Sequence, residues 1–280
     1  MSLPIDLHLA LASLPAMGRG LLINILLTFV TLGIGLFTSL LVTLARMSKN
    51  RVLSALAGLY VVFFRGAPLL ILLYLVYYGF GQIAAVRNGP LWLIFGNAFS
   101  CAIIGLVLNH TAFMVEVVRG AIEAVPAGLI EASKALGITP RQTFLHIRLP
   151  LAMRYGLKAY QNEVVMFAKG TAVVSTITVN DLTSVANGIF ETTYDPFTPI
   201  LTAAALYWIF VNIIRLGFLK IDRYLNSHLI SDEKQRQKVV VRKTIGLVSR
   251  PALVPVGAAV PVGAALPVGA ALPAAREHAL

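Results

Sequence analysis

The sequence predicts an all-α, polytopic membrane protein with about five transmembrane helices. Apolar residues make up 58% of its 280 residues and charged residues only 12%, against about 25% charged in a soluble domain. Several apolar runs are long enough to cross ~30 Å of hydrocarbon. A water-soluble domain would have to expose much of this apolar surface. We therefore expect a lipid bilayer to cover it.

Five apolar regions meet the length that a membrane span requires. They lie at about residues 20–45, 52–80, 98–118, 160–179 and 199–219. The second region is interrupted by R-G-A-P at 65–68, and the fourth is marginal because it contains Gln161, Asn162, Glu163 and Lys169. Residues 91–95 are apolar but too short to span, so we expect them at the interface.

The basic residues predict the orientation, because flanking Lys and Arg stay in the cytoplasm. With the N-terminus outside, nineteen of the 23 Lys and Arg lie inside and two, Arg19 and Arg87, lie outside. The remaining two lie at membrane depth. A membrane also explains the formal charge of +11 better than nucleic acid does. The predicted parts are a periplasmic N-terminal segment (1–19), a transmembrane domain (20–225) with a cytoplasmic hairpin at about 120–150, and a cytoplasmic low-complexity tail (226–280).

The hairpin has strong local signals for helix, turn and helix. Gly137 stands where a helix needs a left-handed C-terminal residue. Thr139 can cap the next helix, with Pro140 at its first position and Gln142 completing a capping box. Pro150 is predicted to end this second helix. Two short helices around an enforced bend predict a surface that docks to another protein.

Charged residues in the fourth span predict a functional path. A lone charge in hydrocarbon costs at least ~2.5 kcal/mol, so neither Glu163 nor Lys169 can face lipid. Six residues of helix turn these two side chains to different sides, whereas Asn162 and Lys169 share a face. Their amide, carboxylate and ammonium could complement a zwitterionic or cationic amino acid. Pairing with a neighbouring subunit is the alternative.

Other intramembrane polar residues have structural explanations. Glu116 and Arg119 are three residues apart, which predicts an intrahelical ion pair. Asn109 could form a hydrogen bond between helices or contact a ligand. At the break in the second region, Arg65 is predicted to satisfy carbonyls that are freed beside Gly66 and Pro68, because irregular backbone at membrane depth must be lined by protein.

The sequence contains no motif for ATP binding, metal binding or catalysis by this chain itself. No G-x-x-x-x-G-K-[ST] loop occurs, so nothing predicts a phosphate cradle for ATP. The single Cys101 and the five scattered His have no metal-ligand spacing. We therefore expect a transport subunit that is not an enzyme, binds no metal or cofactor itself, and relies on another chain for energy.

Five short motifs carry a resemblance to a known family. They are F-R-G-A-P-L-L at 64–70, L-N-H-T-A-F-M-V-E-V-V-R-G at 108–120, E-A-S-K-A-L-G at 131–137, N-E-V-V at 162–165 and K-G-T-A at 169–172. Together they resemble the inner-membrane permease subunits of bacterial ATP-binding-cassette (ABC) importers for polar amino acids. Within that group, the chain is most similar to subunits for histidine and other basic amino acids, or for opines.

The resemblance implies a type I importer fold in a bacterial inner membrane. It also implies four partners: a cytoplasmic ATPase dimer holding ATP and magnesium, a second permease subunit, a periplasmic substrate-binding protein, and the amino acid. The predicted ATPase contacts are Glu131, Ala132, Ser133, Leu136, Gly137 and Pro150. The predicted substrate path contains Asn109, Asn162, Glu163 and Lys169. Structural or gating roles are predicted for Arg65, Gly66, Pro68, Glu116 and Arg119.

Departures from the family pattern bear mainly on specificity. Ser133 replaces an alanine, which we predict to have little consequence. Ala67, Leu72 and Gly170 replace a threonine, a frequent glutamine and a common aspartate near the membrane path. These changes leave the transporter interpretation intact but weaken any transfer of substrate specificity.

Two other classes of function remain open at this point. A secondary transporter or channel would use Glu163 and Lys169 as a relay without an ATPase, but leaves the capped hairpin unexplained. A membrane scaffold or sensor would explain the hairpin as a docking site without requiring intramembrane charges.

In the tail, prolines recur every six residues from Pro255 to Pro273. This spacing argues against a sixth membrane span, because each proline interrupts an α-helix. A membrane-surface or fusion-derived segment is the alternative there.

Overall fold

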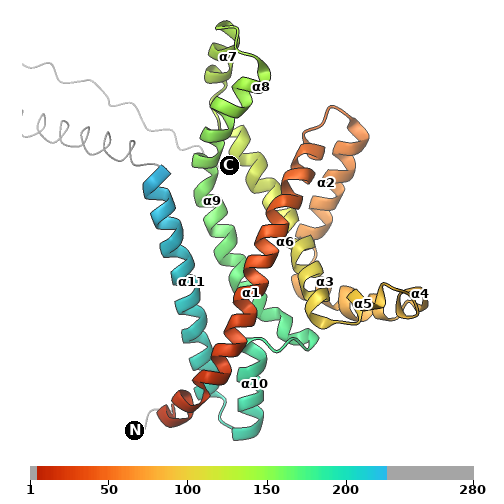
Figure 1. Ribbon diagram of the computed structural model, residues 1–280, viewed down its shortest axis with the longest axis vertical. Helices are drawn as coiled ribbons and strands as arrows, with labels where there is room; N and C mark the ends of the chain where they lie inside the picture. Colours follow the sequence, from red (N-terminus) through yellow and green to blue (C-terminus); the bar gives the residue numbers. More distant parts are fainter. Residues whose placement is uncertain (1–4, 226–280) are drawn as a thin grey trace, which may run out of the picture. The chain divides into compact units, whose positions relative to one another are not determined.

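A computed structural model describes residues 5–225, and these are helical with no strand among them (Figure 1). The predicted tail, 226–280, lies outside the described residues. In chain order the elements are α1 (Leu7–Arg46), α2 (Arg51–Gly66), α3 (Leu69–Tyr74), the π-helical η1 (Leu75–Gly79), α4 (Ala84–Arg87), α5 (Trp92–Phe95), α6 (Ala98–Glu123), α7 (Ala127–Ala135), α8 (Pro140–Gln142), the π-helical η2 (Thr143–Arg148), α9 (Leu149–Gly170), the 3₁₀-helical η3 (Thr171–Ile177), α10 (Leu182–Thr193) and α11 (Phe197–Leu225).

The first helix begins well before the span that the sequence predicts. α1 starts at Leu7, where the Asp6 carboxylate accepts the His8 and Leu9 N–H groups at 2.9 and 3.1 Å. It then continues through Pro15 as a single 40-residue helix. The predicted boundary at residue 19, between a periplasmic segment and the membrane domain, falls inside this one continuous helix and stays a prediction.

The predicted break in the second apolar region is confirmed. α2 and the α3–η1 segment meet at a bend of 106°, and Ala67 and Pro68 both have extended backbone there. Proline disfavours helical geometry in the residue before it, which explains why α2 ends at this point. The later residues 91–95, predicted to be too short to span, hold only the four-residue α5.

The number of spans depends on how α9 is treated. Of the described helices, α1, α6 and α11 are long and apolar enough to cross a membrane, and the bent α2–η1 pair could count as a fourth. With 22 residues α9 is long enough, but it carries Arg154, Lys158, Glu163 and Lys169. The predicted fourth span, the total of five spans and the predicted orientation of the termini stay predictions.

Small residues allow the helices to pack closely. α1 packs mainly along α6, and a Cβ atom on Gly35 would lie only 2.6 Å from the buried His110 ring. Gly20 similarly approaches the backbone of Leu182 on α10. The main apolar core lies between α1, α3, α6, α9 and η3 and is built around Leu27, Leu73, Leu106, Phe167, Val174 and Ile177.

A buried polar cluster joins α1, η3, α10 and α11. The Asn24 amide donates to the Asp181 carboxylate at 3.1 Å and to the Thr171 hydroxyl at 3.2 Å, and its oxygen accepts the Leu182 N–H at 2.9 Å. The Tyr207 hydroxyl also donates to Asp181, at 3.2 Å. Burial raises the pKa of the Asp181 carboxyl, and these hydrogen bonds oppose that rise. We call these residues the Asn24–Asp181 cluster.

Candidate functional site

The hairpin has the turn that the sequence predicts. Gly137 has a φ of +74°, the left-handed conformation that glycine adopts at low cost. Its N–H donates to the Lys134 carbonyl at 3.0 Å, and the Ile138 N–H donates to the Ser133 carbonyl at 3.0 Å. These two bonds form a Schellman motif. The end of α7 is thus fixed by bonds within six residues of chain.

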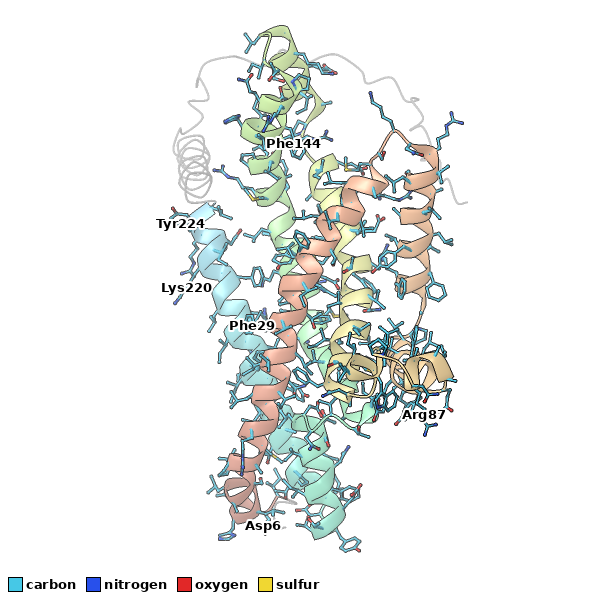
Figure 2. All side chains as sticks on the ribbon, turned by 45° about the vertical axis from the view of Figure 1, so that its right-hand side comes forward. Asp6, Phe29, Arg87, Phe144, Lys220 and Tyr224 are labelled. Atoms are coloured by element: carbon cyan, nitrogen blue, oxygen red, sulfur yellow. The ribbon has the colours of Figure 1, made fainter. Side chains whose placement is uncertain are left out.

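The predicted capping box is confirmed as well. The Gln142 N–H donates to the Thr139 hydroxyl at 3.4 Å, and the Gln142 side-chain oxygen accepts the Thr139 N–H at 3.3 Å. Pro140 occupies the start of α8. The hairpin lies at one end of the described helices, near Phe144, and Asp6 lies at the other (Figure 2).

Pro150 does not end a helix, so that prediction is wrong. The chain runs helically through η2 into α9, with Pro150 in the first turn of α9. Proline lacks an N–H and clashes with the carbonyl four residues earlier in an α-helix. The preceding π-helical turn, in which the Leu149 N–H donates to the Phe144 carbonyl, widens the helix and accommodates the ring.

Ser133 has a larger role than the sequence predicts. It is only 2% exposed, and its hydroxyl donates to the Ile130 carbonyl at 2.8 Å and lies 3.0 Å from the Thr143 hydroxyl. Because the Ser133 proton goes to Ile130, Thr143 donates to Ser133. This bond joins α7 to η2. The predicted contacts Glu131, Ala132 and Leu136 are instead exposed.

The base of the hairpin is attached to two long helices. The Arg148 guanidinium donates through Nε to the Ile122 carbonyl near the end of α6, at 3.3 Å. Ile122, Val125 and Ala152 form a small buried apolar cluster beside this bond. A displacement of the hairpin would therefore move the adjoining ends of α6 and α9.

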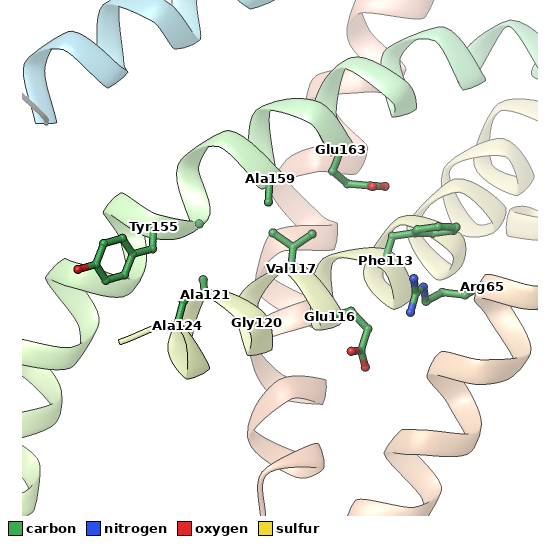
Figure 3. Close-up of a pocket in the computed structure, with 11 residues that line it drawn as sticks. Arg65, Phe113, Glu116, Val117, Gly120, Ala121, Ala124, Tyr155, Ala159 and Glu163 are labelled. Atoms are coloured by element: carbon green, nitrogen blue, oxygen red, sulfur yellow. The ribbon is translucent and has the colours of Figure 1, made fainter. Parts of the chain in front are cut away.

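A cavity of about 430 Å³ lies between α2, α6 and α9 (Figure 3). It brings together predicted residues from three separate motifs, Arg65, Glu116 and Glu163. In Figure 3 the Phe113 ring lies between Glu163 and Arg65. The other residues lining the cavity are Val117, Gly120, Ala121, Ala124, Tyr155, Gly156 and Ala159. The sequence does not indicate these partners, because small and aromatic residues carry no spacing signal of their own.

Arg65 does not satisfy the freed carbonyl at the α2 break, contrary to the prediction. The Asn109 amide donates to the Phe64 carbonyl there at 3.1 Å. The Arg65 guanidinium instead lies over the Phe113 ring, with its carbon 5.3 Å from the ring centroid, a cation–π contact. The tertiary structure therefore exchanges the expected roles, since Asn109 stabilises the break and Arg65 faces the cavity.

The predicted Glu116–Arg119 ion pair is confirmed, and its Arg119 Nη2 and Glu116 Oε2 atoms lie 2.7 Å apart. Arg119 also forms an ion pair with Glu123 at 2.8 Å. Glu123 is not among the residues predicted above, although its spacing of four residues from Arg119 is a standard signal for such a pair. The Glu116 charge is therefore neutralised locally.

The predicted substrate-path residues are not all brought together. Glu163 lines the cavity, whereas Asn162 and Lys169 are exposed on α9 and do not line it. This separation agrees with the helical offsets along the fourth span. Among the described residues, no group of three His, Cys, Asp or Glu could hold a metal ion.

Comparison with known proteins decides the family. Residues 32–225 match the family described as "binding-protein-dependent transport system inner membrane component". The chain belongs to this family. It is 36% identical to the nopaline transport system permease protein NocM of Agrobacterium fabrum over 225 residues, covering 80% of this chain and 93% of that protein. The histidine/lysine/arginine/ornithine permease HisM of Escherichia coli K12 is 33% identical over 211 residues, covering 75% and 89%.

Solved structures agree with this assignment. The chain superposes on "an amino acid ABC transporter with histidines" with a TM-score of 0.70 and 30% identity, covering 80% of this chain and 100% of that chain. The MetNI methionine ABC transporter, in an inward-facing conformation, gives 0.57 at 21% identity, covering 79% and 99%. That second likeness shows the fold alone. The protein is thus a multi-pass membrane protein and a permease subunit of an ABC import system.

Proposed function

We propose that this chain forms the translocation path of an ATP-driven importer for polar amino acids or opines in a bacterial inner membrane. The observation that carries this proposal is a cavity with both a cation and a carboxylate in a family member whose hairpin is shaped for docking. Its relatives are named for nopaline, octopine, arginine and histidine. The expected partners are an ATPase dimer that binds ATP and magnesium, a second permease subunit and a periplasmic binding protein.

The hairpin would couple this chain to the ATPase. Glu131 and Ala132 are exposed on α7, and Leu136, the residue that follows α7, is 79% exposed despite being apolar. Such a bare side chain at the tip suits insertion into a groove on a partner. Nucleotide would then bias a two-state equilibrium, because the ATPase would hold the hairpin differently in its two states.

The bonds within the hairpin support its role as a rigid lever. The Ser133–Thr143 bond joins its two arms, and the Arg148–Ile122 bond ties it to α6. Motion at α7 would therefore reach α6 and α9 together. These are the helices that carry Phe113 and Glu163 into the cavity.

The substrate path is proposed to include Glu163, with Asn109, Asn162 and Lys169 nearby. Exposed Asn162 and Lys169 would need a second permease subunit to cover them, because an unpaired amide and, still more, a charge are costly against lipid at this depth. A gradient-driven relay between Glu163 and Lys169 has less support, since only Glu163 lines the cavity.

The test is uptake by membrane vesicles that contain the permease subunits, the ATPase and the binding protein. We expect uptake of radiolabelled arginine, histidine or octopine only when ATP is present on the side of the membrane where the ATPase is bound. Uptake of a substrate that follows an ion gradient and needs no ATPase would support a secondary transporter and contradict the proposal.

Coupling can be tested with a matched glycine pair. Gly137→Ala places a Cβ at positive φ and costs about 1–2 kcal/mol locally, so it should misdirect α7 and reduce uptake and ATPase co-purification. Gly128→Ala changes the same helix where a Cβ meets no atom within 4 Å and φ is not positive, so it should be tolerated. Equal uptake by the two variants at equal expression would remove Gly137 from the coupling surface.

A further inference from the structure

Arg65 and Glu163 line the same cavity with opposite charges but do not form an ion pair. Of the charged residues that line the cavity, Glu116 forms an ion pair, with Arg119. Glu163 also accepts no hydrogen bond from the described residues. An uncompensated carboxylate at membrane depth is costly. The two charges therefore call for a ligand that carries the complementary pair.

The third charged residue of the cavity is already compensated. Glu116 receives two hydrogen bonds from the Arg119 guanidinium, at 3.1 and 2.7 Å. This leaves one free cation, Arg65, and one free carboxylate, Glu163, among the described residues that line the cavity. A ligand with one carboxylate and one ammonium would satisfy both.

Arg65 is held in a suitable position for such a ligand. Its guanidinium lies over Phe113, and the main chain before it is fixed by the Asn109 bond to the Phe64 carbonyl. A stacked guanidinium keeps its planar fork of donors available for bidentate binding of a carboxylate. The volume of about 430 Å³ lies within the range of small-molecule sites.

We propose that Arg65 binds the α-carboxylate of the transported amino acid and that Glu163 binds its α-ammonium. This inference rests on the proposed function and deepens it. The site would read the group that all α-amino acids share, and the side chain of the substrate would lie against Val117, Tyr155 and Ala159. An N-substituted amino acid retains a carboxylate and an amine on its α-carbon, so it meets the same requirement.

The experiment measures binding to the purified permease–ATPase complex in nanodiscs, without the binding protein. Calorimetry would compare L-arginine and L-histidine with their carboxamides, which lack the carboxylate, and with 5-guanidinopentanoate and 3-(imidazol-4-yl)propanoate, which lack the ammonium. Loss of a charge-assisted hydrogen bond corresponds to about tenfold to a hundredfold in affinity. We expect the complex to prefer each amino acid over both analogues by such a factor.

The variants should separate the two preferences. Arg65→Gln should abolish the preference over the carboxamide and keep the preference over the des-amino analogue, and Glu163→Gln should do the reverse. Arg87→Gln removes a charge at an exposed position on α4 that does not line the cavity, so it should leave both preferences unchanged.

Arg65→Lys guards against a variant that fails to assemble, because it keeps the charge without the planar fork. Its preference over the carboxamide should fall between those of wild type and Arg65→Gln. Unchanged preferences in every Arg65 variant that assembles would overturn the proposal, as would a wild-type complex that does not prefer the amino acids over their analogues. Failure of the proposed function is distinguishable, because it appears as absent ATP-driven uptake by wild-type vesicles.

Discussion

At its Pro150 end, α9 joins a hairpin whose bonds connect residues near in sequence, ten apart for Ser133 and Thr143 and 26 apart for Arg148 and Ile122. At its Gly170 end, the chain enters the Asn24–Asp181 cluster, where the Asn24 side chain bonds to groups 147 to 158 residues away. One end is set by turn and cap chemistry and the other by long-range packing.

This difference has a mechanical consequence for the helix that carries Glu163. Local bonds preserve the internal shape of the hairpin while it moves, which suits a lever. A buried cluster joining four elements resists separation of those elements, because each buried polar group would lose its partner. We therefore expect α9 to be moved at its Pro150 end and to pivot at its Gly170 end.

The largest expected effect is at the pivot. Asn24→Leu removes both donors of the amide and leaves the buried Asp181, Thr171 and the Leu182 N–H short of partners, at a cost of about 3 kcal/mol. Thermal unfolding of the purified protein in detergent would measure it. Asn187→Leu, at an exposed position on α10, is the control. Equal melting temperatures for the two variants would break the comparison between the ends.

A smaller effect is expected inside the hairpin. Ser133→Ala leaves the buried Thr143 hydroxyl without its acceptor, and Thr143→Val removes the same bond from the other side. A double-mutant cycle should give a coupling energy of about 1 kcal/mol. Uptake at equal expression would show whether that bond serves the lever. A coupling energy near zero would mean that the two arms are joined by the turn alone.

The smallest effect is expected in the exposed turn before α11. This turn also has hydrogen bonds between residues near in sequence, although it does not belong to the hairpin. Hydrogen bonds from Thr198 and Phe197 lower the pKa of the Asp195 carboxyl. Because the folded-state pKa is depressed, its stabilising contribution is present above the usual pKa of about 3.9. It is lost as the pH falls through the lowered value. NMR titration should place the Asp195 midpoint below that of an ordinary aspartate, and a midpoint at or above 3.9 would contradict this.

The amino-acid sequence by itself determined the features that depend on residues close together in the chain. The apolar runs, the break before Pro68, the left-handed Gly137, the capping box at Thr139 and the Glu116–Arg119 pair all follow from spacings of a few residues. Local sterics and hydrogen bonding are sufficient to fix these features, and the structure contains each of them.

Only the tertiary structure decided which distant groups meet. It assigned the freed Phe64 carbonyl to Asn109 and turned Arg65 towards Phe113. It placed Asn24 against Asp181 and separated Glu163 from Lys169. Each of these outcomes depends on how helices rotate and cross. Hydropathy does not encode that rotation, because a helix with polar groups on several sides can satisfy them against more than one neighbour, and the choice is made by the packing of all the helices together.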